Sequence, residues 1–219
     1  MNRRLTAFIA VLAVSILTLA VCASKVEAQP IQEIAYDDGT AEFGVATELG
    51  SQLAVRFSLP SGWSEAQLLT AKYYIRAYPS TFRVHVYGSD GSTELITPFE
   101  VTPTTTGWLE VDLSALNIIV TDDFYITIEY ITTADEEWIE EIPFIGGDSS
   151  NPDGRSYMGT AGSWNLHTTA DLMIRAVVQQ RLPVGGTVLQ TNSFTLLTPY
   201  IAIFAAIAIG LTVALKKRL

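Results

Sequence analysis

The chain of 219 residues contains 23 Asp and Glu against 13 Lys and Arg, a formal net charge of −10, and a single cysteine. Six of the basic residues lie at the two ends, so residues 29–190 hold 22 acidic and 7 basic side chains, a net charge of −15. A domain this acidic repels phosphate backbones, which argues against nucleic-acid binding.

The first 28 residues have the features of a signal peptide. Arg3 and Arg4 precede an apolar run at 5–22, and Val26-Glu27-Ala28 is a small-residue site for cleavage after Ala28. We therefore expect 1–28 to be removed on export. Two alternatives stay open. The run is longer than a usual signal core, which suits an uncleaved anchor, and Cys22, the sole cysteine, could carry a lipid.

Residues 29–182 are dominated by alternation of apolar and polar side chains, which predicts strands with one apolar face. The predicted strands cover 52–59, 69–77, 82–87, 108–113, 124–130 and 172–178. One helical turn is expected at 64–69. Short strands separated by turn residues predict an all-β fold, an antiparallel β-sandwich of jelly-roll type. Its core should contain Phe82, Val84, Phe124, Ile126, Ile128, Leu172 and Ile174.

The end of the chain predicts a membrane anchor. Residues 183–195 are polar and contain glycine, as in a juxtamembrane linker, and the apolar run 196–215 is long enough to span about 30 Å as a helix. The basic tail 216–219 should stay in the cytoplasm, which places 29–195 outside the plasma membrane. A weaker alternative is a sorting motif at 182–186, with removal of the tail.

Several segments together resemble a β-sandwich module that recurs in secreted and surface-anchored archaeal and bacterial proteins. They are Tyr36-Asp37-Asp38-Gly39-Thr40, Leu53-Ala54-Val55-Arg56-Phe57, Thr81-Phe82-Arg83-Val84-His85-Val86-Tyr87, Thr106-Gly107-Trp108, Asp123-Phe124-Tyr125-Ile126, Gly154-Arg155-Ser156-Tyr157 and Asp171-Leu172-Met173-Ile174-Arg175-Ala176. The tail 184–200 is similar to the membrane anchor of archaeal surface proteins. The resemblance implies an extracellular accessory domain with no established activity.

Catalytic motifs are missing from the sequence. It contains no H-E-x-x-H, G-x-S-x-G, P-loop or G-x-G-x-x-G pattern. Of its two histidines, His85 lies on the polar side of a predicted strand and is interpreted as a satisfied surface residue, and His167 lies in a polar loop. We therefore predict that the chain is not an enzyme and has no catalytic residues.

Calcium is the metal that the sequence suits best, because hard oxygen donors on turns bind it. Asp37, Asp38, Asp148 and Asp153 all lie in predicted turns and are the candidate ligands. The alternative is that these aspartates cap the backbone of their own turns. No other cofactor is expected.

Trp63, Trp138 and Trp164 fall in loops or at strand ends, where recognition residues of sandwich domains gather. They are the candidate ligand-binding residues, since an aromatic face can stack on a sugar ring; the alternative is that each covers an end of the core. Trp138 sits among five carboxylates in the segment 135–141, which reads as an exposed loop or edge kept soluble by charge.

These features favour a membrane-anchored cell-surface binding or adhesion protein, whose partner is an envelope carbohydrate or a surface protein. Two alternatives stay open: an envelope-glycan hydrolase that uses an Asp/Glu pair, and a purely structural envelope protein. A cleft with two converging carboxylates would favour the hydrolase, and an exposed aromatic strip would favour glycan binding.

Overall fold

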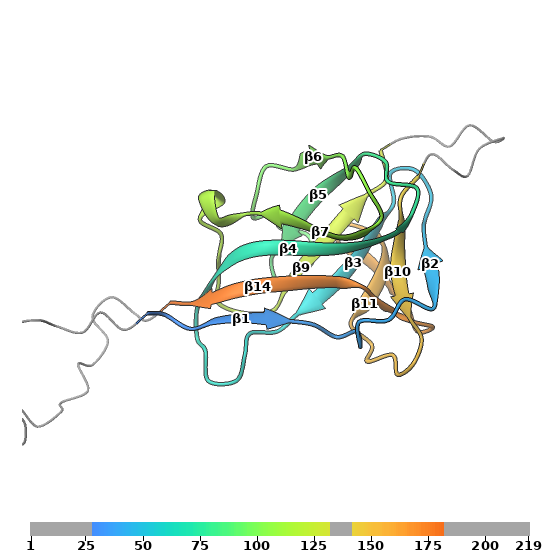
Figure 1. Ribbon diagram of the computed structural model, residues 1–219. Coiled ribbons are helices and arrows are strands. Elements are labelled where there is room, and N and C mark those ends of the chain that lie inside the picture. Colours follow the sequence, from blue (N-terminus) through green and yellow to red (C-terminus); the bar gives the residue numbers. More distant parts are fainter. Residues whose placement is uncertain (1–27, 132–141, 182–219) are drawn as a thin grey trace, which may run out of the picture. The chain divides into compact units, whose positions relative to one another are not determined.

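The computed structural model describes residues 28–131 and 142–181, which form an all-β domain of two antiparallel sheets (Figure 1). The eight-stranded sheet contains β1 (Ile31–Ile34), β2 (Phe43–Val45), β4 (Ala66–Ala77), β7 (Gly107–Asp112), β8 (Ile119–Val120), β10 (Phe144–Asp148), β13 (Asp171–Leu172) and β14 (Ile174–Gln180). The six-stranded sheet contains β3 (Gln52–Phe57), β5 (Phe82–Tyr87), β6 (Phe99–Val101), β9 (Phe124–Glu129), β11 (Ser156–Thr160) and β12 (Ser163–Leu166). The described ranges contain one short 3-10 helix, η1 (Ser114–Leu116).

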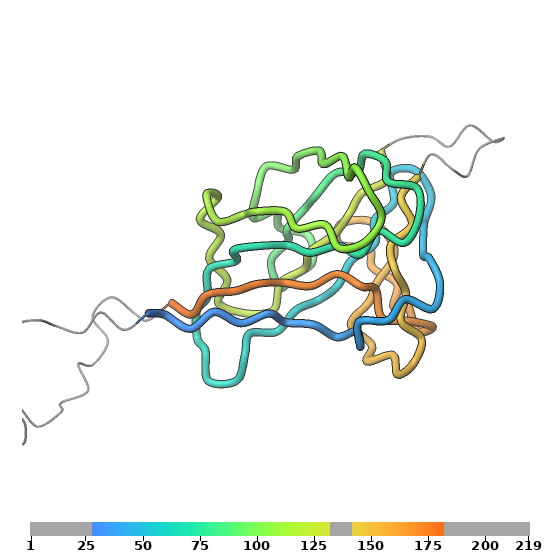
Figure 2. The backbone as a smooth tube through the Cα atoms, in the orientation of Figure 1, coloured from blue at the N-terminus to red at the C-terminus, as the bar shows by residue number. Residues whose placement is uncertain are grey.

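Strands that are distant in sequence are neighbours in both sheets. The first runs β1-β14-β4-β10-β13, with β7 and β8 also on β4 and β2 on β10, and the second runs β12-β11-β3-β9-β5-β6. Because β1 pairs with β14, the start and the end of the described domain lie side by side, and the Gln180 N–H donates to the Pro30 carbonyl at 2.9 Å (Figure 2).

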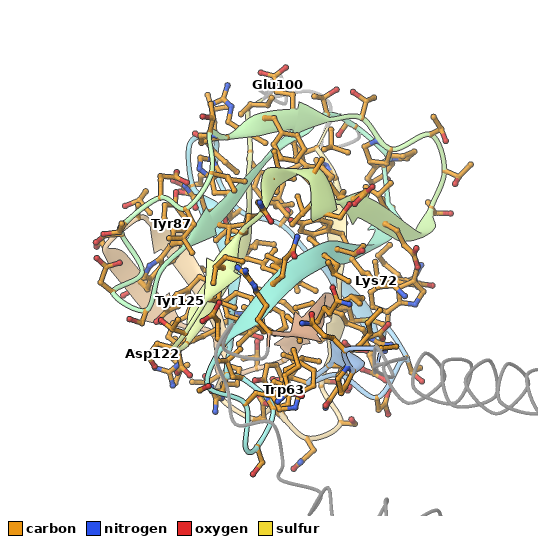
Figure 3. The ribbon with its side chains drawn as sticks, turned by 90° about the vertical axis from the view of Figure 1, so that its left-hand side faces the viewer. Trp63, Lys72, Tyr87, Glu100, Asp122 and Tyr125 are labelled. Atoms are coloured by element: carbon orange, nitrogen blue, oxygen red, sulfur yellow. The ribbon has the colours of Figure 1, made fainter. Side chains whose placement is uncertain are left out.

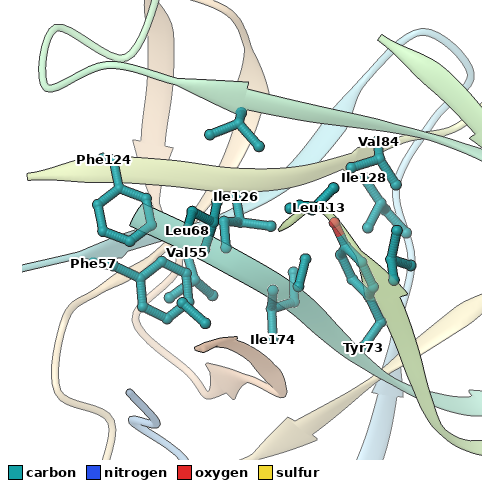
Figure 4. Packing of buried hydrophobic residues seen from close by; sticks show 14 of the residues in the cluster. Val55, Phe57, Leu68, Tyr73, Val84, Leu113, Phe124, Ile126, Ile128 and Ile174 are labelled. Atoms are coloured by element: carbon teal, nitrogen blue, oxygen red, sulfur yellow. The ribbon is translucent and has the colours of Figure 1, made fainter. Parts of the chain in front are cut away.

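The core lies between the two sheets. Val55, Phe57, Phe124, Ile126 and Ile128 of the six-stranded sheet face Leu68, Tyr73 and Ile174 of the eight-stranded sheet (Figure 4). All seven residues predicted to be buried are at most 1% exposed, which confirms them. Alternation was a reliable guide here because successive side chains of a strand point to opposite faces.

Two local predictions were wrong. The expected helical turn at 64–69 is instead the approach to β4, which begins at Ala66 and pairs with both β14 and β8. The single strand expected at 172–178 is divided at Met173, because β13 pairs with β10 whereas β14 pairs with β1 and β4. In both places pairing with distant strands decides the local backbone.

The membrane segments predicted from the sequence lie outside the described residues. These are the apolar run 5–22, the linker 183–195 and the helix 196–215, and Trp138 lies outside as well. Between 28 and 131 and between 142 and 181, no helix is long and apolar enough to cross a bilayer.

Candidate functional site

The aspartates predicted to bind calcium divide into separate groups. Asp37 is bound by Arg175, whose Nε donates to Oδ2 at 3.0 Å and whose Nη2 donates to Oδ1. The Asp37 side chain is completely buried, and its Oδ1 also accepts the Gly39 N–H at 3.0 Å. Arg175 therefore compensates the charge of Asp37. The two residues are 138 positions apart, so the turn sequence around Asp37 does not indicate this partner.

Asp38 and Asp148 do come together. Asp148 Oδ2 accepts the Asp38 N–H at 2.7 Å, and Oδ1 accepts the N–H and the hydroxyl of Ser150 at 2.8 and 2.6 Å. Burial disfavours the charged form, but these hydrogen bonds hold the pKa of Asp148 below its ordinary value. Among the described residues, no group of three or more His, Cys, Asp or Glu is arranged to hold a metal ion. Calcium binding stays a prediction.

Asp153 joins a different carboxylate, Asp171, which was not among the predicted calcium ligands. The Asp153 N–H donates to both oxygens of Asp171 at 3.0 and 3.2 Å, and Asp171 lies opposite Asp148 across β13 and β10. Asp171 is only 1% exposed. Burial, and then the charges of Asp153 and Asp148, raise the pKa of Asp171 to about 7.

We expect Asp171→Asn to gain stability relative to the wild type as the pH rises. An unfolded aspartate has a pKa of about 3.9, so between about pH 4 and pH 7 folding takes up a proton and the wild type loses stability with rising pH. This group accounts for a loss on the order of 4 kcal/mol over that range, which asparagine avoids. Urea unfolding at pH 5 and pH 8 measures the difference, with Asp122→Asn on an exposed turn as the control. Parallel pH profiles for Asp171→Asn and the wild type would contradict it.

The candidate tryptophans occupy different places. Trp63 is half-buried in the turn before β4 and packs against the main core, as the alternative interpretation holds. Trp164 lies on β12 and joins an aromatic cluster on the outer face of the six-stranded sheet. Sequence reasoning missed Trp108, which is 37% exposed on the opposite sheet with the Arg175 guanidinium 4.3 Å above its ring.

The aromatic cluster contains Tyr87, Tyr125, Tyr157 and Trp164, and we call it the aromatic face. Trp164 stacks on Tyr125 with an interplanar angle of 8° and ring centroids 6.0 Å apart, and Tyr157 meets Tyr125 edge-on at 5.8 Å. Cross-strand register creates the cluster, since Tyr87 lies opposite Tyr125 on the same face of β5 and β9. Figure 3 shows Tyr87, Tyr125 and Asp122 along one side of the molecule and Lys72 on the other.

A glycine turn secures the cluster. The Trp164 Nε1–H donates to the Gly91 carbonyl at 2.7 Å, and the Gly162 N–H donates to the same oxygen at 2.9 Å. Gly91 has a φ of 65°, and a Cβ atom there would come within 2.7 Å of Trp164 Nε1. Only glycine fits this left-handed, close approach. The loop 88–94 therefore holds Trp164 in place.

His85 departs from the sequence interpretation, because it is 6% exposed and thus not a surface residue. It is satisfied as expected: Nδ1 lies 2.6 Å from Glu94 Oε1, and Nε2 lies 3.0 Å from Glu129 Oε2. Tyr87 stacks on the imidazole and places its hydroxyl 3.1 Å from Nδ1. His85 therefore supports the floor of the aromatic face. The other histidine, His167, has its Nε2 3.1 Å from the Thr169 hydroxyl.

Two arginines adjoin the aromatic face, and we call them the arginine pair. Arg56 lies on β3 opposite Tyr125, with its guanidinium 5.9 Å from the Tyr157 ring centre. Arg155 immediately precedes β11, and its carbonyl accepts the Arg56 N–H at 2.9 Å. Both guanidiniums approach one carboxylate, Asp123, at 3.6 and 3.8 Å. Basic, acidic and aromatic groups thus meet where β3 ends and β9 and β11 begin.

A small cavity of about 160 Å³ includes Asp123 in its lining. It is lined by Gly88, Ser89, Leu95, Ile119, Val120, Thr121, Asp122, Asp123 and Phe124. Asp122 Oδ1 accepts the Asp123 N–H at 2.8 Å. The loop that holds Trp164 therefore also contributes Gly88 and Ser89 to this cavity, next to the arginine pair.

Comparisons with known proteins give partial matches. No family model matches the chain. It is 32% identical over 168 residues to bacillopeptidase F of Bacillus subtilis (strain 168), which covers 69% of this chain and 11% of that protein. The chain therefore matches about a tenth of the length of this curated relative.

Two solved structures of a clostridial protein are similar at low identity. One contains the cysteine protease and lectin-like domains of Cwp84, a surface layer associated protein of Clostridium difficile, with a TM-score of 0.46, 15% identity, and coverage of 60% of this chain and 32% of that chain. The other is clostridial cysteine protease Cwp84 after propeptide cleavage, with a TM-score of 0.46, 13% identity, and coverage of 72% and 42%. The fold and the site described above define an all-β domain with an aromatic face.

Proposed function

We propose that this chain is a cell-surface binding protein that binds a carbohydrate on the aromatic face without catalysing its turnover. The carrying observation is the parallel stack of Trp164 on Tyr125, in which Trp164 is half-buried and Tyr125 is 7% exposed, with the arginine pair beside it. Aromatic rings offer an apolar platform for the C–H face of a sugar, and nearby polar groups orient the hydroxyls.

The same proposal includes the membrane topology and the module resemblance. A signal peptide at 1–28 and a single helix at 196–215 would display the domain outside the plasma membrane, with jelly-roll connectivity. Bacillopeptidase F matches over only 11% of its length, which supports the view that modules of this kind accompany other parts of a larger chain. The name of that relative does not make this chain a peptidase.

Binding is favoured over hydrolysis by the contacts of three carboxylates that border this face, Asp123, Glu94 and Glu129. Asp123 faces two guanidiniums, and Glu94 and Glu129 both face His85. Each of these acids is therefore engaged by a basic group of the protein. A glycosidase needs two carboxyl groups free to act on opposite sides of one glycosidic bond.

Trp164→Ala is expected to weaken carbohydrate binding by tenfold or more, because a few aromatic side chains contribute most of the binding free energy of an interface. The full chain in detergent micelles is measured against a panel of envelope polysaccharides by titration calorimetry. Trp108→Ala is the matched control, since Trp108 is a 37% exposed tryptophan on the outer face of the other sheet.

Equal affinity of both variants and the wild type would overturn the proposed site. Turnover of a polysaccharide by the wild type would establish the hydrolase instead. Thermal unfolding of Trp164→Ala and Trp164→Phe shows whether a loss of binding reflects a loss of fold. The phenylalanine variant keeps a ring on Tyr125 but cannot donate to the Gly91 carbonyl.

A further inference from the structure

The basic residues of the domain are unequally paired. Lys72 lies within 3.0 Å of both Glu33 and Glu110, and Arg83 lies within 3.2 Å of both Glu129 and Glu100. In contrast, Arg56 and Arg155 share Asp123, at 3.6 and 3.8 Å, and no other ion pair involves them in the part of the chain that the structure describes. Two guanidiniums therefore share one carboxylate at ion-pair distance, although the Asp153 carboxylate accepts the Arg155 N–H at 2.9 Å.

Arg56 also has an unused hydrogen-bond donor. Its Nε atom is buried, lies 3.6 Å from Asp123 Oδ2 and has no partner within hydrogen-bond distance, and no other buried side-chain nitrogen or oxygen within 28–131 and 142–181 is in this position. Such atoms are rare, and an absent ion or water is a common explanation. A guanidinium presents its N–H groups in a planar fork that matches the two oxygens of a carboxylate.

The arginine pair is held in place without neutralising its charge. The Arg155 Nη1–H donates to the Ser58 hydroxyl at 2.7 Å, and its guanidinium lies 5.4 Å from the Tyr36 ring centre. The Arg56 guanidinium lies near Tyr157 in the same way. These contacts fix the two cations through neutral groups. The Arg56 and Arg155 side chains remain 36% and 28% exposed, so a ligand in solution can reach them.

We propose that Arg56 and Arg155 bind the carboxylate of an acidic sugar residue whose ring rests on the aromatic face. This inference rests on the proposed function and names its ligand as a uronate-type saccharide. The juxtaposition carries it: two partly exposed guanidiniums that share one carboxylate lie beside Tyr157 and the Trp164–Tyr125 stack.

The acidity of the domain as a whole limits the ligand to isolated charges. At physiological salt, exposed charges more than about 8 Å apart are largely screened, so one carboxylate responds to the arginine pair. A densely charged polyanion would extend over the rest of a surface whose net charge is −15 for residues 29–190. The ligand is therefore a saccharide with sparse carboxylates.

The test compares a galactose oligomer that ends in a single galacturonate with an all-galactose oligomer of the same length, each titrated into the full chain in detergent micelles. The wild type should bind the uronate about tenfold or more tightly than the neutral sugar, as expected for a charge-assisted pair. Raising the salt concentration should reduce this preference. Arg56→Gln and Arg155→Gln should each lower the preference toward one and remove its salt dependence.

Arg76→Gln is the matched control, because Arg76 is an exposed arginine on β4 of the other sheet and should leave the preference unchanged. Unchanged melting temperatures show that the glutamine variants fold. Equal binding of both oligomers by the wild type, or a preference that survives Arg56→Gln, would overturn this inference alone. If the wild type binds neither oligomer, and Trp164→Ala does not change the affinity for any polysaccharide of the wider panel, both the proposed function and this inference are overturned.

Discussion

Replacing Ile126 with alanine is expected to lower the free energy of unfolding by about 2–5 kcal/mol. Ile126 is fully buried on β9, with Val55 and Val86 opposite it on the neighbouring strands β3 and β5. Removing three carbon atoms there loses their transfer free energy and leaves a cavity that a sheet hydrogen-bonded on both sides cannot readily close. Urea unfolding monitored by tryptophan fluorescence measures the loss.

Ile31→Ala is the matched control for the core prediction. Ile31 lies on the edge strand β1 and is 60% exposed, so the same substitution should change the free energy of unfolding by less than about 0.5 kcal/mol. Similar losses at Ile126 and Ile31 would show that the space between the sheets is not the core of this domain.

The second large effect is expected at Arg175, where substitution by methionine should cost about 3–5 kcal/mol. Arg175 is the ion-pair partner of the fully buried Asp37 carboxylate, and without it the Gly39 N–H is the one hydrogen-bond donor left to this charge among the described residues. Hydrogen bonding to Asp37 raises the pKa of the Arg175 guanidinium above its ordinary value. Methionine preserves much of the apolar length but also loses the pair with Glu33 at 2.8 Å and the contact with Trp108, so a double variant is needed to isolate the effect of the unpaired carboxylate.

Two further variants make this prediction specific. Arg181→Met removes a more exposed pair with Glu65, at 3.5 Å, and should cost less than about 1 kcal/mol. Adding Asp37→Asn to Arg175→Met should restore part of the stability, because it removes the buried charge. Equal losses for Arg175→Met and Arg181→Met, or no recovery in the double variant, would contradict an important buried ion pair at this position.

The position of Trp164 shows where prediction from sequence ended. As a tryptophan in a loop or at a strand end it could be nominated for binding, but so could Trp63, which packs against the core instead. The difference depends on Gly91, 73 residues away, whose carbonyl accepts the indole N–H. No local pattern indicates which tryptophan has such a partner.

The sequence by itself determined the class of fold and the inner faces of its main strands. Alternation is a property of neighbouring residues, so the burial of Phe82, Ile126 and Ile174 could be inferred without knowing which strands pair. The same reasoning placed His85 on a solvated face. Alternation shows which side chains point away from the core, but not whether other residues cover them.

Only the tertiary structure decided what that outer face became. The loop 88–94 and β12 contribute Glu94 and Trp164 to the outer face of the six-stranded sheet, where Ala54, His85 and Tyr87 are all buried. The arginine pair and the Asp37–Arg175 contact likewise join residues about 100 or more positions apart. Such contacts follow from strand order and register, which are set by the free energy of packing the whole domain and not by any single segment.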